Sequence, residues 1–153
     1  MECYEGATMI KTFRGLIADD GQDTIVLHTN DGSTGYRLVK FQIINKQPGT
    51  ADYENVVKIY KNSQSSIDAT VDFSDNTLLA VAYGSADATG QNNPATEIVI
   101  FDKEVFNQDI YVTNKAVSIG SSQNYYIELE QIKLDLNENT VATLKDIRNT
   151  KIS

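Results

Sequence analysis

Residues 124–136, NYYIELEQIKLDL, carry the clearest structural signal in the sequence. Tyr125, Ile127 and Leu129 alternate with two glutamates, and this period of two is typical of a β-strand with one buried face. The apolar residues then move to even positions, which predicts a β-bulge near Glu130–Gln131.

The same period recurs in three further stretches, YRLVKFQII (36–44), NVVKIYK (55–61) and FNQDIYVTN (106–114). In the first of them, Val39 is predicted to share a buried face with Phe41 and Ile43. Strands are also predicted at five other places: residues 8–17, 24–30, 66–73, 96–102 and 141–149.

Two segments lack this alternation. The uninterrupted apolar run Ile98–Phe101 predicts a central strand that is covered on both faces. Residues 74–84, SDNTLLAVAYG, predict the one helix, with Ser74 or Asp75 as its N-cap and Gly84 at its end. We therefore expect a single-domain, all-β, antiparallel β-sandwich of jelly-roll type, with about nine strands and one short helix. Residues 1–10 are expected to form an N-terminal arm.

Turn signals separate the strands. Asp20-Gly21, Asp31-Gly32 and Pro48-Gly49 each predict a turn in which glycine supplies the positive φ. The longest polar connection, YGSADATGQNNPAT (83–96), surrounds Gly90, and long loops of this kind are often functional or mobile.

The composition excludes several classes of protein. The 153 residues fit one domain, and the net charge of −8 would repel a phosphate backbone, so we expect no nucleic-acid partner. Cys3 is the only cysteine, which rules out an internal disulfide and a thiol-based zinc site. No secretory signal or apolar run of about 20 residues is visible, so we expect a soluble protein made in a cytoplasm.

The acidic stretch DDGQDTIVLHTNDGSTGY (19–36) raises the question of a calcium loop. Such a loop needs ligands at alternating positions and a glutamate after the glycine, whereas Asp19 and Asp20 are adjacent and no glutamate follows. Turns around a strand are the favoured interpretation, and no metal or cofactor is expected.

No catalytic signature is recognisable either. His28 is the only histidine and lies within an expected strand, and no serine stands in a nucleophile elbow. Glu128 and Glu130 share one strand face about 7 Å apart, which is more typical of a solvated or partner-facing stripe than of a glycosidase pair.

Strings along most of the chain, from about Phe13 to Arg148, resemble a group of small virion structural proteins of marine tailed phages, including cyanophages. The most distinctive strings are FDKEVFNQDIYVT (101–113) and NYYIELE (124–130). Others are FRGLI (13–17), GYRLVKFQII (35–44) with QPG (47–49), ENVVKIYK (54–61), TVDFSDNTLLAVAY (70–83) and TVATLKDIRN (140–149).

This resemblance implies a non-enzymatic virion protein, expected on the capsid exterior as a decoration or cement protein. Its partners would be the major capsid protein or other virion proteins, with the chain itself as a homo-oligomer. The alternative is a neck, tail or surface adhesin that binds a host receptor or glycan. A polysaccharide depolymerase is the third hypothesis. The candidate interface residues are Phe106, Asn107, Gln108, Asp109, Tyr111, Tyr125 and Tyr126.

Overall fold

The computed structural model of the chain describes residues 9–49, 52–87, 95–101, 103–117 and 119–135. None of these residues forms a helix, so a helix long and apolar enough to cross a membrane is not found among them. The strands in this part of the chain are β1 (Met9–Ile17), β2 (Gly21–Ile25), β3 (Thr34–Asn45), β4 (Tyr53–Tyr60), β5 (Leu78–Ala86), β6 (Ala95–Ile100), β7 (Val105–Phe106), β8 (Ile110–Ala116) and β9 (Gln123–Lys133).

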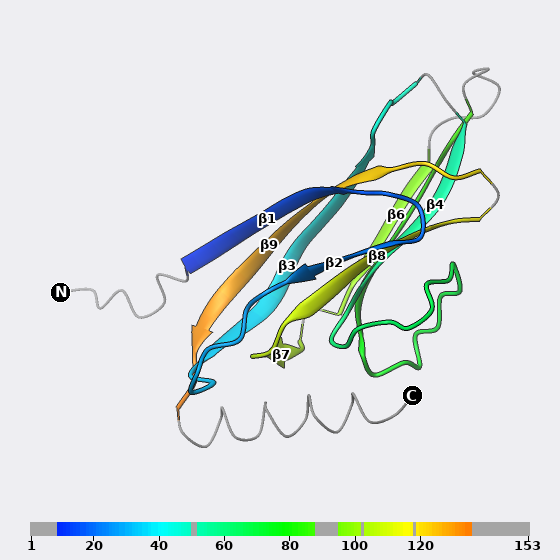
Figure 1. Cartoon of the computed structure of the whole chain (residues 1–153). Coiled ribbons are helices and arrows are strands. Elements are labelled where there is room, and N and C mark those ends of the chain that lie inside the picture. Colours follow the sequence, from blue (N-terminus) through cyan, green and yellow to red (C-terminus); the bar gives the residue numbers. More distant parts are fainter. Residues whose placement is uncertain (1–8, 50–51, 88–94, 102, 118, 136–153) are drawn as a thin grey trace.

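The strands form two antiparallel sheets (Figure 1). Sheet A has the order β1-β9-β3-β7, and sheet B has the order β2-β8-β4-β5-β6. From β1 to β4, and again from β6 to β9, each connection crosses from one sheet to the other. This path is that of a jelly roll with one additional strand, β6, beside β5. The predicted all-β sandwich is confirmed.

The inner faces of the two sheets form one hydrophobic core. The alternation predicted for Tyr125, Ile127 and Leu129 is confirmed, because all three point into this core and are buried. The core is completed by side chains from both sheets, among them Leu38, Phe41, Val57, Ile59, Ala80, Ala82, Ile110 and Val112.

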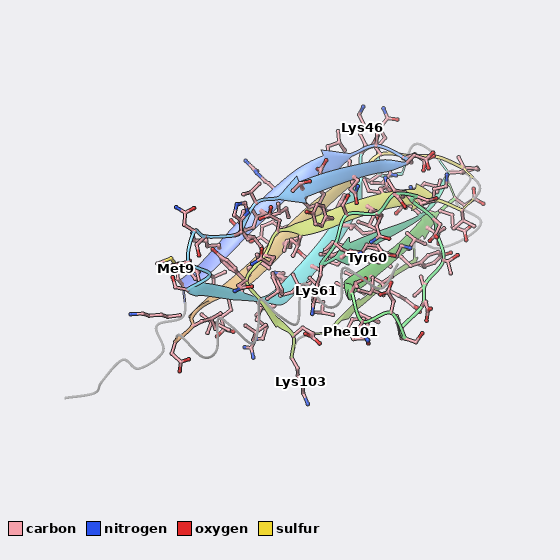
Figure 2. All side chains as sticks on the ribbon, turned by 60° about the horizontal axis from the view of Figure 1, so that its bottom comes forward. Met9, Lys46, Tyr60, Lys61, Phe101 and Lys103 are labelled. Carbon is pink, nitrogen blue, oxygen red and sulfur yellow. The ribbon has the colours of Figure 1, made fainter. Side chains whose placement is uncertain are left out.

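The outer face of sheet B is covered by the connection between β4 and β5, residues 61–77, which we call the strap. Beneath it lies a second apolar cluster, formed by Val56, Tyr60, Leu78 and Val81. Figure 2 labels Tyr60, at the end of β4, and Lys61, the first residue of the strap. Sheet B is therefore buried on both faces at β4 and β5.

A buried lysine fastens the strap. The side chain of Lys58 is only 2% exposed, and its Nζ donates to Asp68 Oδ1 at 2.9 Å and to the carbonyl oxygen of Thr70 at 2.7 Å. The ammonium group also lies 5.3 Å from the ring centroid of Tyr60. The strap is also held near its start, where the side chain of Gln22 on β2 forms hydrogen bonds with the hydroxyl of Ser63 and with the backbone of Gln64.

The predicted helix over 74–84 is wrong, because Leu78–Ala86 is the strand β5. Leu78, Leu79, Ala80, Val81 and Ala82 are all buried, some in the core and some under the strap. A strand that is covered on both faces shows no alternation, and its alanines imitate a helical pattern. The expected N-cap, Asp75, instead accepts hydrogen bonds from the backbone and hydroxyl of Thr77 in a turn.

The prediction of a doubly covered strand at Ile98–Phe101 is also wrong. The strand here, β6, lies at the edge of sheet B and pairs only with β5 among the described strands. Ile98 and Val99 are 37% and 41% exposed. The centre of the sheet is occupied by β4 and β5 instead.

The β-bulge lies on β3 and not at Glu130–Gln131. The pairing of β9 with β1 continues without a shift through Gln131, whereas the pairing of β9 with β3 shifts between Leu38 and Lys40. The extra residue, Val39, is therefore exposed. Leu38 takes the inward position that the sequence predicted for Val39.

Two other expected strands differ from the structure. Residues 66–73 belong to the strap and have no strand, and β2 ends at Ile25 rather than continuing through 30. The expected strand at 141–149 lies outside the described residues. The expected arm lies outside them too, except for Met9 and Ile10, which begin β1. Gly32 and Gly49 have the expected positive φ, but at the first turn Asp20 takes it, at 62°.

Candidate functional site

The aspartates of residues 19–36 are used to hold the fold. Asp19 Oδ1 accepts a hydrogen bond of 2.8 Å from the backbone of Ala116, and Asp20 Oδ1 lies 2.6 Å from Lys115 Nζ. The remaining two, Asp23 and Asp31, bond to Tyr125 and to the turn at Thr29 and Ser33. Within the described ranges, no group of three or more histidine, cysteine or acidic side chains could hold a metal ion.

His28 lies in the loop after β2, where its Nδ1 is 2.7 Å from Asp109 Oδ1. The same carboxylate oxygen accepts from the backbone nitrogens of Leu27 and His28, at 2.8 Å and 3.0 Å. Partial burial alone would raise the pKa of Asp109, but the hydrogen bonds from His28 and Leu27 outweigh it and lower this pKa. The pair anchors a loop, and none of the described hydrogen bonds brings a hydroxyl or thiol to the imidazole.

The residues before Asp109 serve the same loop. Phe106 is buried in the core, and the buried Asn107 donates from Nδ2 to the carbonyl oxygen of Gly32 at 3.2 Å. Gln108 donates to Asn107 Oδ1. The polar groups of this stretch thus satisfy a neighbouring loop within the same chain.

The three candidate tyrosines lie in different places. Tyr111 on β8 is half-buried and alternates with the inward-facing Ile110 and Val112. Tyr125 points into the sandwich, and Tyr126 points to the outer face of sheet A. The candidate interface residues are therefore distributed over the core, a loop anchor and both outer faces.

A buried amide network closes one end of the sandwich. Asn55 Nδ2 donates to Asn114 Oδ1 at 2.8 Å, and Asn114 Nδ2 donates to the carbonyl oxygen of Ile17 at 3.0 Å. Both asparagines also donate to the carbonyl oxygen of Ser121. The network fixes β1, β4 and β8 to one another and to the loop before β9, and it was not predicted from the sequence.

The outer face of sheet A is exposed in the part of the chain that the structure describes. The strand register brings residues of β1, β9 and β3 together in rows, each given in that order. The rows are Ile10-Glu130-Arg37, Thr12-Glu128-Lys40, Arg14-Tyr126-Gln42 and Leu16-Asn124-Ile44.

In each of the first two rows, a glutamate on β9 pairs with a basic side chain on β3. Arg37 forms an ion pair with Glu130, and Lys40 Nζ lies 3.9 Å from Glu128 Oε2. Glu128 and Glu130 do share one face, as the sequence predicts, but each has a basic neighbour across the strand pair. Paired in this way, the two glutamates form part of a charged surface and not an acid–base pair in a cleft.

The last two rows form an open groove of about 470 Å³. Its lining includes Arg14, Leu16, Gln42, Ile44 and Tyr126. Leu16 is 48% exposed and Ile44 is 63% exposed. The sequence contains a signal for this groove, since both aliphatics take outward positions of their strands. The signal becomes readable only when β9 is known to lie between β1 and β3.

No family model matches the sequence, and no match was found among curated proteins.

Proposed function

We propose that this chain is a phage virion structural protein that binds the head shell from outside as a decoration or cement protein. The proposal is supported by the strings between Phe13 and Arg148 that resemble virion proteins of marine tailed phages. A jelly-roll path is compatible with this role, because such folds occur in viral capsid domains and also in lectins. Fold alone does not assign function, and the two outer faces of the sandwich provide further support.

The contrast between the two outer faces is the observation that carries the proposal. The strap covers the outer face of sheet B at β4 and β5, whereas the outer face of sheet A leaves Ile10, Leu16 and Ile44 exposed beside ordered ion pairs. Exposed apolar side chains beside an ordered polar surface are typical of a protein-binding face. Sheet A is therefore the shell-facing side in this proposal.

An exposed strand edge would join neighbouring copies. Along β6, Ile98 and Val99 are exposed, and Glu97 is the one charged residue between Ala95 and Ile100. Proteins usually protect such edges with charge or cover, because an uncovered edge pairs with other strands. Pairing of β6 with another copy would support the expected homo-oligomer.

The proposal is tested by deleting the gene from the phage and heating purified particles. We expect the mutant heads to release DNA at a lower temperature than the wild-type heads, and added purified protein to restore the difference. Heads of unchanged heat stability that also fail to take up the added protein would contradict a cement role. A protein that instead binds isolated host envelope would support the adhesin alternative.

A further inference from the structure

The groove on sheet A exists because the middle strand of three carries a short side chain at one position. In the row Leu16-Asn124-Ile44, asparagine stands between two longer aliphatic side chains. The next side chain on the same strand, Tyr126, does not fill the gap. Its hydroxyl donates to Glu128 Oε2 at 2.9 Å, so the ring leans along the strand away from Asn124.

A second contact holds that ring in place. Lys40 Nζ lies 5.9 Å from the ring centroid of Tyr126, and Lys40 itself is held near Glu128. Cation–π and hydrogen-bond contacts of this kind restrict the rotamer of an exposed tyrosine. The groove is therefore a feature of the free protein, and its formation does not need a ligand.

The chemistry of the groove combines one cation with two apolar walls. Among the described residues, Arg14 has no ion-pair partner, whereas Arg37 and Lys40 on the same face are both paired. An unpaired guanidinium favours a carboxylate over other partners, because it donates two parallel hydrogen bonds to the carboxylate oxygens. Leu16 and Ile44 favour an aliphatic side chain, and this apolar pair argues for a polypeptide rather than a sugar ring.

The strand geometry sets the spacing of the two features. Arg14 and Leu16 are two residues apart on β1, so their side chains leave the sheet about 7 Å from each other along the strand. An extended peptide that runs parallel to β1 repeats on the same face with the same spacing. A carboxylate two residues from an aliphatic residue would therefore meet Arg14 while the aliphatic side chain lies between Leu16 and Ile44.

We infer that this groove binds an extended segment of a neighbouring virion protein with an aliphatic residue and a glutamate or aspartate two positions apart. The inference rests on the proposed function for the identity of the neighbour. It names the segment by its spacing and charge, and it assigns the recognition to Arg14, Leu16, Ile44 and the floor at Asn124.

The test is a titration of the ¹⁵N-labelled full chain with the peptide acetyl-Ser-Leu-Ser-Glu-Ser-amide, followed by NMR. We expect the largest amide shifts at Leu16, Ile44 and Asn124. A glutamine in place of the glutamate should weaken binding about fivefold, the upper range for an exposed ion pair. The peptide acetyl-Ser-Ser-Leu-Glu-Ser-amide, which places the two side chains on opposite faces, should lose a similar factor.

Protein variants complete the test. Arg14→Glu should remove the preference for glutamate over glutamine, and Asn124→Trp should block the groove. Lys103→Glu makes the same charge change at an exposed lysine outside the groove lining and should bind like the wild type. If a variant does not fold, the three peptides on the wild-type chain still decide the question.

Several results would overturn the inference. These are equal affinity for all three peptides, shifts that cluster elsewhere, tighter binding of trigalacturonate than of the peptide, or a groove filled by a second copy. The last would appear as a dimer in sedimentation that Arg14→Glu dissociates. Peptide binding by a chain that is absent from virions would sink the proposed function alone. Normal decoration of particles by Arg14→Glu, without peptide binding, would sink the groove inference alone.

Discussion

The hydroxyl group of Tyr125 on β9 donates a hydrogen bond of 2.9 Å to Asp23 Oδ2 on β2, and so joins sheet A to sheet B. Burial raises the pKa of Tyr125, and the bond to Asp23 raises it further, so the hydroxyl remains a donor throughout the neutral range. The bond lies across the side of the sandwich where β1 and β2 form the two sheet edges.

Tyr125→Phe should lower the free energy of unfolding by about 1 kcal/mol, because it removes the donor and leaves Asp23 partly buried without it. Urea denaturation monitored by fluorescence measures the change. Tyr111→Phe is the matched control, since Tyr111 has no hydrogen bond among those described, and it should stay within about 0.5 kcal/mol of the wild type. Equal effects of the two substitutions would contradict a role for the bond.

Gly15→Ala should destabilise the protein by about 1–3 kcal/mol through overpacking. Gly15 faces Tyr125 across β1 and β9, and a Cβ at this position would lie 2.7 Å from the Tyr125 hydroxyl oxygen and 2.9 Å from its ring. At Gly84 the nearest atom would be the flexible end of Ile43, at 3.2 Å, so Gly84→Ala should cost less. Thermal unfolding of both variants gives the ranking, and the reverse order would contradict this packing.

Asp68→Ala should loosen the strap and destabilise the protein by about 2 kcal/mol, because Lys58 is buried and would lose its carboxylate partner. The cost stays below that of a fully buried pair because Asp68 is 61% exposed, so water can partly replace it. Lys58→Met, which removes the charge and keeps the volume, should cost less than Asp68→Ala.

Limited proteolysis locates this effect. In Asp68→Ala we expect the first cleavage within 61–77, whereas Asp72→Ala, which removes only local turn bonds to Ser74, should leave the cleavage pattern unchanged. Cleavage that begins outside the strap in Asp68→Ala would show that Lys58 does not fasten it.

Stability should fall in acid as the pH drops below the ordinary aspartate pKa of 3.8. Hydrogen bonding to Lys58 lowers the pKa of Asp68, and in Asp109 the bonds from His28 and Leu27 outweigh burial and lower its pKa too. A carboxyl with a lowered folded pKa stabilises the protein above its unfolded pKa, and this contribution is lost as the pH falls through the folded value.

Asp109→Asn should therefore be less stable than the wild type at pH 7 and should lose less stability between pH 6 and pH 3. Urea midpoints at the two ends of this range measure the difference. Parallel pH curves for the variant and the wild type would contradict the assignment of Asp109.

The sequence correctly predicts those strands that have one buried face and one face exposed to solvent. The alternation at Tyr125, Ile127 and Leu129 is visible because their neighbours Tyr126, Glu128 and Glu130 point to the open face of sheet A. At Ala80 and Ala82 it fails, because the strap covers the other face and removes the polar half of the pattern. The prediction for the apolar run at Ile98 fails for the opposite reason. Exposed apolar residues on an edge strand have the same sequence pattern as buried residues on a central strand.

The groove could not have been predicted residue by residue. Arg14, Asn124 and Ile44 are adjacent only because β9 pairs with both β1 and β3, and no local pattern encodes that strand order. The anchoring of the loop after β2 by Asp109 also depends on a contact between residues far apart in the chain. Local patterns gave Tyr126 its outward position but not its contact with Lys40.

Quantitative mass spectrometry of purified virions tests the central claim most directly, with the major capsid protein as the internal standard. A decoration or cement protein should be present in many copies per particle, at a fixed ratio to the major capsid protein in every preparation. Absence of the chain from the particles would contradict a virion role. A few copies per particle would contradict a role on the head shell.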